Sequence, residues 1–113
     1  MLVRNVTRNT VLGDSITKAT TSATRRAGLL RHTNLPKGEG LWIAPCEAVH
    51  CFGMKFPIDV LYLNRKRQVI KVRANLKPWR VSGCLLAHSV LELPAGMAGE
   101  TQTQKGDQLE FEQ

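Results

Sequence analysis

Long hydrophobic runs, paired cysteines and a secretory leader are all missing from this sequence. No window approaches the roughly 18 consecutive apolar residues that a membrane-spanning helix needs. Arg4 and Asn5 interrupt the first apolar stretch, which makes it unlike a signal peptide. Cys46, Cys51 and Cys84 are an odd number, so they do not form the disulfide framework of a small secreted protein. We therefore expect a cytoplasmic protein with reduced thiols and no membrane span.

Acidic residues are absent between positions 59 and 92, where seven of the sixteen basic residues lie. Strict alternation along an expected strand over 68–74 predicts one basic face beside a basic turn. It comprises Arg65, Lys66, Arg67, Lys71 and Arg73. Such a face attracts polyanions, nucleic acid included, although aromatic residues form only 5% of the chain and offer few stacking partners. A solvated edge that prevents sheet-to-sheet aggregation explains the same residues.

A length of 113 residues, with 42% apolar and 22% charged residues, predicts a single globular domain over 1–113. Helical spacing of apolar residues is convincing only in Thr20–Leu30, where Thr20 or Ser22 can cap a short helix that ends near His32. Short strand patterns cover Leu2–Val6, Thr10–Leu12, Leu41–Ala44, Ile58–Leu63, Gln68–Ala74, Trp79–Val81, Ala87–Leu93 and Gln108–Glu112. The expected fold is mainly β, α+β at most: a small antiparallel sandwich or open barrel with one helix in its N-terminal half.

Reactive side chains gather between Leu41 and Asn64, and cysteine chemistry is the first possibility there. Cys46 and His50 share a spacing with Cys84 and His88, and two thiolates with two imidazoles are a zinc ligand set. Neither half has the close cysteine pair of structural zinc sites, so we expect no metal. Cys46 or Cys51 beside His50 offers a thiol and a base, but catalytic pairs usually meet across a fold. Small apolar core residues are the favoured interpretation of these thiols.

Two carboxylates in apolar strands are the second possibility. Asp59 shares a strand face with Leu61 and Leu63, and Glu92 is enclosed in VLELPAG, so both are expected to be buried. Together with His50 they can line one cleft, where perturbed pKa values mark function. The structural alternatives are that Asp59 holds the loop over 46–56 closed, and that Glu92 pairs with Arg26 or Arg80.

Several blocks of the chain keep a recognisable order and spacing: GLLRHTNLPKGEGLWIAPCEAVHCFGMKFPIDVLYLN, VIKV, NLKPWR, SVLELPAG and KGDQLEF. Over about residues 26–111 the sequence resembles the domain-of-unknown-function 192 family. The resemblance implies a compact, predominantly β domain of bacterial or archaeal type and no established activity; some relatives carry a secretion signal. Positions that match the family pattern are Gly28, Leu29, Trp42, His50, Met54, Asp59, Glu92, Pro94, Gly96, Gly106 and Asp107. Cys84 and His88 lie outside that pattern.

The functional expectation is a non-catalytic binding module without a cofactor, whose partner is a small ligand or a protein. An apolar cleft with a few convergent polar groups is the usual form of a ligand site. The expected lining residues are Trp42, His50, Met54, Asp59 and Glu92. One alternative is a small hydrolase that uses His50 with Asp59 or Glu92, and another is a polyanion-binding accessory protein that acts through the basic residues over 65–80. The sequence does not indicate an oligomeric state.

Overall fold

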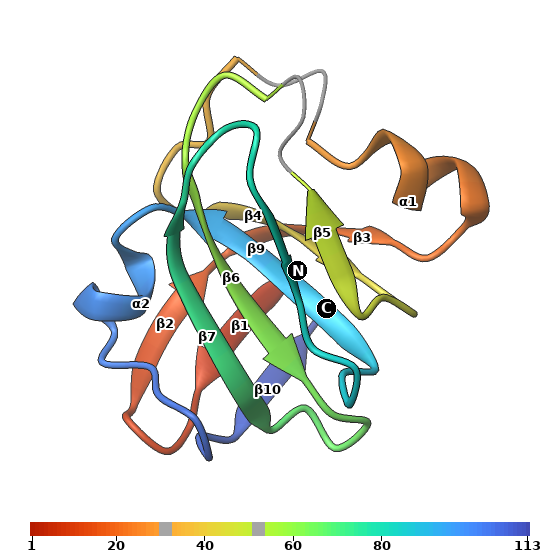
Figure 1. The fold of residues 1–113 in the computed structure, drawn as a ribbon. Helices are drawn as coiled ribbons and strands as arrows, with labels where there is room; N and C mark the ends of the chain where they lie inside the picture. The colour runs from red at the N-terminus through yellow and green to blue at the C-terminus, as the bar shows by residue number, and fades with distance from the viewer. Residues whose placement is uncertain (30–32, 51–53) are drawn as a thin grey trace.

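The fold, a computed structural model, is mostly β (Figure 1). It describes residues 1–29, 33–50 and 54–113, without the side chains of Arg26 and His50. Its elements in chain order are β1 (Leu2–Asn5), β2 (Thr10–Gly13), β3 (Ser15–Ala19), α1 (Ser22–Ala27), β4 (Glu39–Ile43), β5 (Ala48–His50), β6 (Ile58–Leu63), β7 (Val69–Leu76), β8 (Val81–Gly83), β9 (Ser89–Pro94), α2 (Met97–Glu100) and β10 (Leu109–Glu112).

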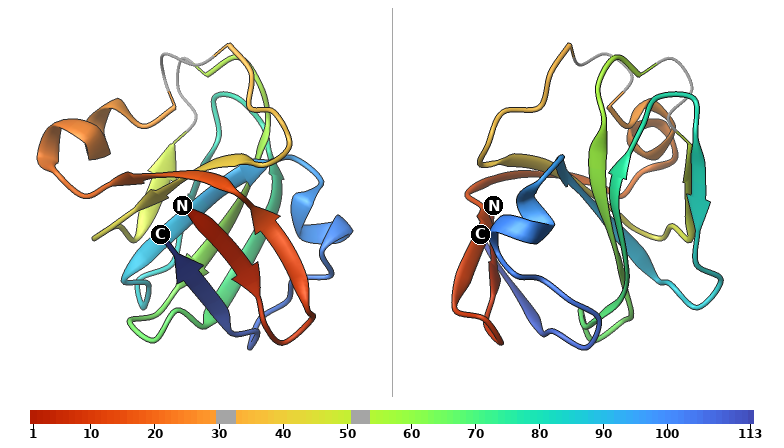
Figure 2. Two further views of the ribbon diagram at one scale, coloured as in Figure 1. Left: turned by 180° about the vertical axis from the view of Figure 1, so that it is seen from behind. Right: turned by 60° about the vertical axis from the view of Figure 1, so that its left-hand side comes forward.

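A five-stranded sheet in the order β3-β4-β9-β6-β7 forms the middle of the molecule. The three-stranded sheet β10-β1-β2 lies on one side of it, and the β5-β8 ribbon and α1 lie on the other (Figure 2). Every residue of β6 is buried, as expected for a doubly covered strand rich in branched residues. The prediction of a mainly β fold is confirmed.

The two faces of the five-stranded sheet form two separate cores. Leu61 and Leu91 face the first core, where they meet Val3, Leu12 and Leu109 from the three-stranded sheet. The neighbouring strand residues face the second core, which lies under the β5-β8 ribbon and includes Ala19, Leu29, Ile43, Met54, Val60, Tyr62, Leu76 and Val90. Successive residues of one strand therefore belong to different cores, because side chains alternate along a strand.

Three elements differ from the expectation. β3 was not expected, because Ile16 and Ala19 are the only buried residues in SITKA; it pairs with β4 in parallel, so the sheet is not wholly antiparallel. β5 was not expected either, because a three-residue strand carries too little pattern. The strand expected over 79–81 begins at Val81, since Trp79 has a φ of 66° and cannot continue an extended strand. A second short helix, α2, follows Pro94-Ala95-Gly96 in the C-terminal half.

The first helix is shorter than expected. Thr21, between the two expected caps, accepts a hydrogen bond from the Thr24 backbone N–H and forms a capping box with it. Gly28, with a φ of 49°, ends the helix after Ala27, because this backbone conformation strains other residues. The expected end near His32 falls outside the described residues.

A β-bulge in β7 changes which way its side chains face. Tyr62 pairs with Lys71 and Leu63 pairs with Val69, so Ile70 is an extra residue on its strand. Val72 packs against the first core and Ile70 against the second, so the strict alternation expected along 68–74 is interrupted at Ile70.

Candidate functional site

Asp59 is buried and fully engaged by the backbone. One of its carboxylate oxygens accepts a hydrogen bond from the Asn75 N–H at 2.8 Å, and the other accepts bonds from Gly96 at 3.1 Å and Ala98 at 2.8 Å. The carboxylate therefore joins β6 to a bend in β7 and to the amino end of α2, whose N-cap residue Gly96 has no side chain to do so. Pinning was the expected structural role, but the segments pinned are these, and none of the described residues of the loop over 46–56 donates to the carboxylate.

Trp42 lies in the first core, on the same side of the sheet as Asp59. Its ring meets Phe111 edge to face at 5.1 Å between centroids. The Arg67 guanidinium lies over both rings, 5.3 Å from the Trp42 centroid and 4.3 Å from that of Phe111. Trp42 is thus a core side chain that also holds a cation.

The expected basic face is divided between the two sides of the five-stranded sheet. Arg67 packs on the first-core side, whereas Lys71 lies over the Tyr62 ring on the second-core side and donates to the Gly83 carbonyl at 2.7 Å. Arg73 pairs with Val60 and faces the same side as Lys71. The expectation that Arg67, Lys71 and Arg73 share one strand face is wrong, because the bulge at Ile70 breaks the alternation.

Glu92 faces the side of the sheet opposite to Asp59. It pairs with Val60 and Leu41, both second-core residues, whereas Asp59 pairs with Leu93 of the first core. Asp59 and Glu92 therefore do not meet, although they lie on adjacent strands. The sheet itself separates the two carboxylates that the sequence placed in one cleft.

A cleft of about 430 Å³ opens over Glu92, and we call it the Glu92 cleft. α1 and the residues after it supply one wall, and the start of β5 and Met54 supply another. Its lining residues are Ser22, Arg25, Ala27, Gly28, Leu29, Ile43, Pro45, Cys46, Ala48, Val49, Met54 and Glu92. Of the five expected pocket residues, Met54 and Glu92 line this cleft. The His50 backbone belongs to β5, and its side chain lies outside the described part of the structure.

The Glu92 carboxyl is the unusual group of this cleft. Only 5% of the residue is exposed, and burial raises the pKa of its carboxyl to about 7. No described side chain, Arg80 included, donates a hydrogen bond to it or forms an ion pair with it. The alternative partner, Arg26, has a side chain outside the described set. A buried carboxyl that no described side chain pairs with is a candidate for pairing with a ligand.

Arg25 and Cys46 stand at the edge of the Glu92 cleft. The Arg25 guanidinium donates to the Thr21 and Pro45 carbonyls and to the Ser22 hydroxyl, at 3.3 to 3.4 Å. The Cys46 thiol donates to the Ala48 carbonyl at 3.1 Å. Burial, reinforced by the nearby Glu92 charge, raises the pKa of the Cys46 thiol against the opposing effect of that hydrogen bond. A raised pKa keeps the thiol protonated, which disfavours Cys46 as a nucleophile. Cys51, the other candidate, lies outside the described residues.

One member of the possible zinc ligand set, the His50 side chain, lies outside the described part of the structure. The Cys46 backbone N–H donates to the His88 carbonyl at 2.9 Å, so these two segments are adjacent. Within residues 1–29, 33–50 and 54–113, no group of three or more Cys, His, Asp or Glu residues is placed to hold a metal ion. The His50 side chain is not among those described, so the four-residue set is not tested as a whole.

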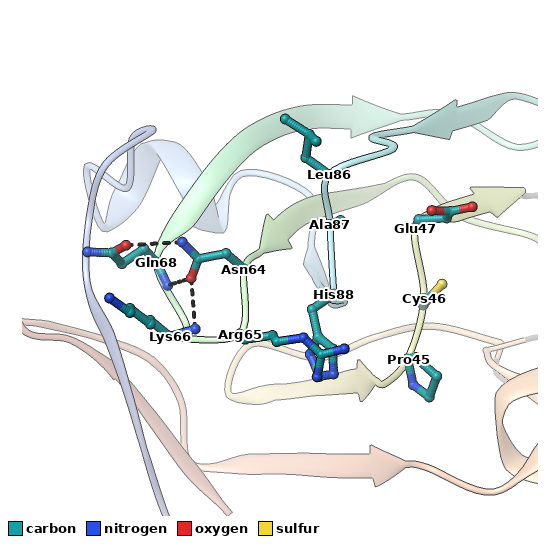
Figure 3. A pocket seen from close by; sticks show the side chains of 10 residues that line it. All are labelled: Pro45, Cys46, Glu47, Asn64, Arg65, Lys66, Gln68, Leu86, Ala87 and His88. Carbon is teal, nitrogen blue, oxygen red and sulfur yellow. Dashed lines mark hydrogen bonds between the residues drawn. The ribbon is translucent and has the colours of Figure 1, made fainter.

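A second hollow, about 710 Å³ and open to solvent, lies where three segments meet (Figure 3). The segments are 45–47, the β6-β7 turn over 64–68, and 86–88. Asn64 shapes the turn, because its side-chain oxygen accepts from the Lys66 and Gln68 backbone N–H groups. Asn64 therefore holds the backbone of the turn whose residues Arg65 and Lys66 line this hollow. Sequence reasoning placed these two residues in a turn but had no signal for the hollow.

Comparison with known proteins identifies the family of this chain. A model of the DUF192 family, described as uncharacterised ACR, matches residues 4–111. The chain belongs to the DUF192 family. The match extends the expected region of 26–111 towards the amino terminus, and the first strands of this DUF192 protein are part of it. A search of curated proteins found no significant match. No helix in the described part of the chain is long and apolar enough to cross a membrane.

Two solved structures share the fold of this DUF192 protein. A protein of unknown function from Novosphingobium aromaticivorans superposes with a TM-score of 0.83 at 24% identity, covering 97% of this chain and 82% of that one. A protein from Sinorhizobium meliloti, which its description proposes to be a transcription regulator, superposes with a TM-score of 0.83 at 19% identity, covering 96% and 89%. At this identity the likeness concerns the fold.

Family-pattern positions in the DUF192 protein divide between scaffold and cleft. Asp107 is scaffold: it accepts two hydrogen bonds from Arg8 and others from Asn5 and the Gln104 backbone. Burial alone would raise the pKa of Asp107, but these donors outweigh it and lower the pKa. Gly28, Leu29, Met54 and Glu92, by contrast, all line the Glu92 cleft.

Proposed function

We propose that this DUF192 protein is a non-catalytic binding module that holds a small molecule in the Glu92 cleft. The observation that carries the proposal is the Glu92 carboxyl, which is 5% exposed, lines a cleft and lacks a partner among the described side chains. The proposed site keeps Met54 and Glu92 from the expected pocket. Trp42 and Asp59 support the scaffold instead.

The size and lining of the cleft support a small ligand. About 430 Å³ falls within the range of about 300–1,000 Å³ that is usual for small-molecule sites. Leu29, Ile43, Val49 and Met54 supply apolar walls, and burying apolar ligand surface against them is favourable. A buried polar group in such a cleft fixes the orientation of a ligand and selects for a matching group on it.

The chemistry of Glu92 suggests the polar end of the ligand. A carboxylate only accepts hydrogen bonds, so the matching group is a donor, and a charged amine matches it best. Arg25 at the edge of the cleft opposes a second positive charge there. The proposed ligand is therefore a compact apolar molecule with one amine that reaches Glu92.

A binding experiment with simple amines tests this function. Purified protein is titrated with a series of alkyl and arylalkyl amines, and amide NMR shifts around Gly28, Leu29 and Met54 are followed. We expect saturable binding that strengthens as the pH rises through about 7, because the carboxyl ionises there. Glu92→Gln should lose most of the amine affinity and the pH dependence, whereas Glu39→Gln, an exposed carboxylate on β4, is the control.

The same experiment separates binding from hydrolysis. A carboxyl with a pKa of about 7 also suits a general base. The hydrolase alternative therefore takes Glu92, together with His50, as its candidate base. Asp59 is not the base in this case, because three backbone donors occupy it. Ester and amide forms of the amines that are recovered intact after long incubation support the binding module. Their Glu92-dependent cleavage would replace it by the hydrolase, and failure of all amines to shift the cleft resonances would refute both.

A further inference from the structure

The turn between β8 and β9 has an unusual composition. The Ala87 N–H donates to the Cys84 carbonyl at 2.9 Å, which closes a turn with Leu85 and Leu86 at its two central positions. These leucines are 87% and 86% exposed. Central turn positions usually carry Gly, Asn, Asp or Pro, whose backbone and polar side chains suit a solvated bend. Neither turn geometry nor contact with water favours two adjacent leucines at these positions, which indicates another role for them.

Further apolar side chains lie along the same segment. Trp79 and Val81 are each 64% exposed, and β8, which begins at Val81, runs along the outer side of the molecule to the leucine turn (Figure 2). A single exposed apolar residue is ordinary, but four large ones within eight residues are a local concentration that favours an interaction surface.

Positive charge surrounds this segment. Seven basic residues and no acidic residue lie between positions 59 and 92, and the rest of the chain has nine basic and nine acidic residues, which cancel. The whole formal charge of +7 therefore comes from this one part of the sequence. Arg67 is turned to the first core, but Arg65, Lys66, Arg73, Lys77 and Arg80 are exposed.

One of the two leucines, Leu86, lies on a hollow that two of the cations also line. Leu86 and Ala87 line the same hollow as Arg65 and Lys66 (Figure 3), so the β6-β7 turn and the leucine turn are neighbours although twenty residues separate them in the sequence. Asn64 fixes the turn that presents the two cations. An apolar tip flanked by fixed cations matches a surface that offers phosphate groups above hydrocarbon.

We propose that Leu85 and Leu86 dock this protein onto an anionic phospholipid surface, with Arg65 and Lys66 against the lipid phosphates. Cations beside a membrane are attracted by anionic lipids, and apolar side chains add insertion between the headgroups. A single-stranded nucleic acid would use the cations, but aliphatic side chains do not stack on its bases as aromatic rings do. The proposal is independent of the Glu92 cleft, which opens beside α1.

Vesicle co-sedimentation tests the proposal. The full chain is mixed at low salt with vesicles of phosphatidylglycerol and phosphatidylcholine, and separately with vesicles of phosphatidylcholine alone. We expect binding to the first and not to the second, and weaker binding as salt screens the charges. The double variant Leu85→Ser/Leu86→Ser should lose about tenfold or more in affinity with every charge intact, because it removes the inserted apolar surface. Arg65→Ser/Lys66→Ser should lose about tenfold because two phosphate contacts are gone.

Matched substitutions elsewhere provide the controls. Val11→Ser removes an apolar side chain that is 50% exposed on the three-stranded sheet, and Lys18→Ser removes a cation on β3, at the opposite edge of the five-stranded sheet from β7. Both should bind as the unchanged protein does. All of these positions are exposed, and thermal melts should confirm that the variants are folded. Absence of binding to the anionic vesicles would overturn the proposal. Undiminished binding by the leucine variant would also overturn it. So would binding to a single-stranded oligonucleotide that is as strong as binding to the vesicles and is unchanged in the leucine variant.

Discussion

At the scale of single residues, Asp59 and Glu92 show how one sheet gives two carboxylates different environments. Both lie in apolar strands and both are nearly inaccessible, at 1% and 5% exposure. Asp59 faces the first core and accepts three backbone hydrogen bonds, which satisfy its charge. Glu92 faces the Glu92 cleft without such donors, and burial raises its pKa to about 7. The difference gives Asp59 a structural role and leaves Glu92 for the proposed ligand.

Replacing Asp59 should be costly. Asp59→Ala leaves the N–H groups of Asn75, Gly96 and Ala98 without their acceptor, and we expect a loss of about 3 kcal/mol or more in the free energy of unfolding. Asp59→Asn should recover part of this loss, because one amide oxygen still accepts while the amide NH₂ faces a donor. Urea unfolding of the three proteins measures both values. An Asp59→Asn variant more stable than the unchanged protein would contradict the structural role.

Replacing Glu92 should have the opposite effect, and it should depend on pH. The pKa of Glu92 rises from 4.5 to about 7 on folding, so the folded state binds the proton more tightly than the unfolded chain. Stability is therefore undiminished below 4.5, falls as the pH rises towards 7 and stays reduced above it. Glu92→Gln should stabilise the protein by about 3 kcal/mol above pH 7 and change little below 4.5. Unfolding curves at the two pH values, with Glu39→Gln as control, measure this difference.

At the scale of elements, the β-bulge in β7 decides where the basic side chains go. Because of the extra residue Ile70, Arg67 lies on one side of the sheet and Lys71 and Arg73 lie on the other. Arg67 therefore reaches the first core. There it lies over Trp42 and Phe111, which come from β4 and β10. One arginine thereby connects the five-stranded and three-stranded sheets.

This position gives Arg67 a structural role that its neighbours lack. Arg67→Ser should lower the free energy of unfolding by about 1 kcal/mol, because it removes a cation from two ring faces. Lys66→Ser, in the same turn but exposed, should leave stability unchanged. Thermal melts of both variants test the difference, and equal melting temperatures would show that the ring contacts contribute nothing.

At the scale of the whole molecule, the two ends of the chain close the fold. β10 pairs with β1 from Leu2 opposite Glu112 to Asn5 opposite Leu109, and the termini lie side by side (Figure 1). Leu109 is buried in the first core, and Phe111 packs against it. The first core is therefore incomplete until the last residues are in place.

Removing the last strand should consequently unfold the protein. A chain that ends at residue 108 loses the pairing with β1 and two core side chains, and a single large-to-small core change already costs about 2–5 kcal/mol. The total is comparable with the entire stability of a small domain, about 5–15 kcal/mol. Circular dichroism should show loss of the cooperative melt. Removal of Gln113 alone, which lies beyond the strand, is the control and should leave the melt intact.

Much of this protein is determined by local sequence. Alternating branched residues place β6, β9 and β10, a threonine and a glycine delimit α1, and the burial of Asp59 follows from its apolar neighbours, because these features depend on residues a few positions apart. Only the tertiary structure decided which carboxylate meets which donors, that Arg67 leaves the basic face, and that Leu86 and Arg65 line one hollow. Those outcomes depend on register, on a one-residue bulge and on which side of a sheet each side chain faces. Register is set by pairing between distant strands, so no short stretch of the sequence contains it.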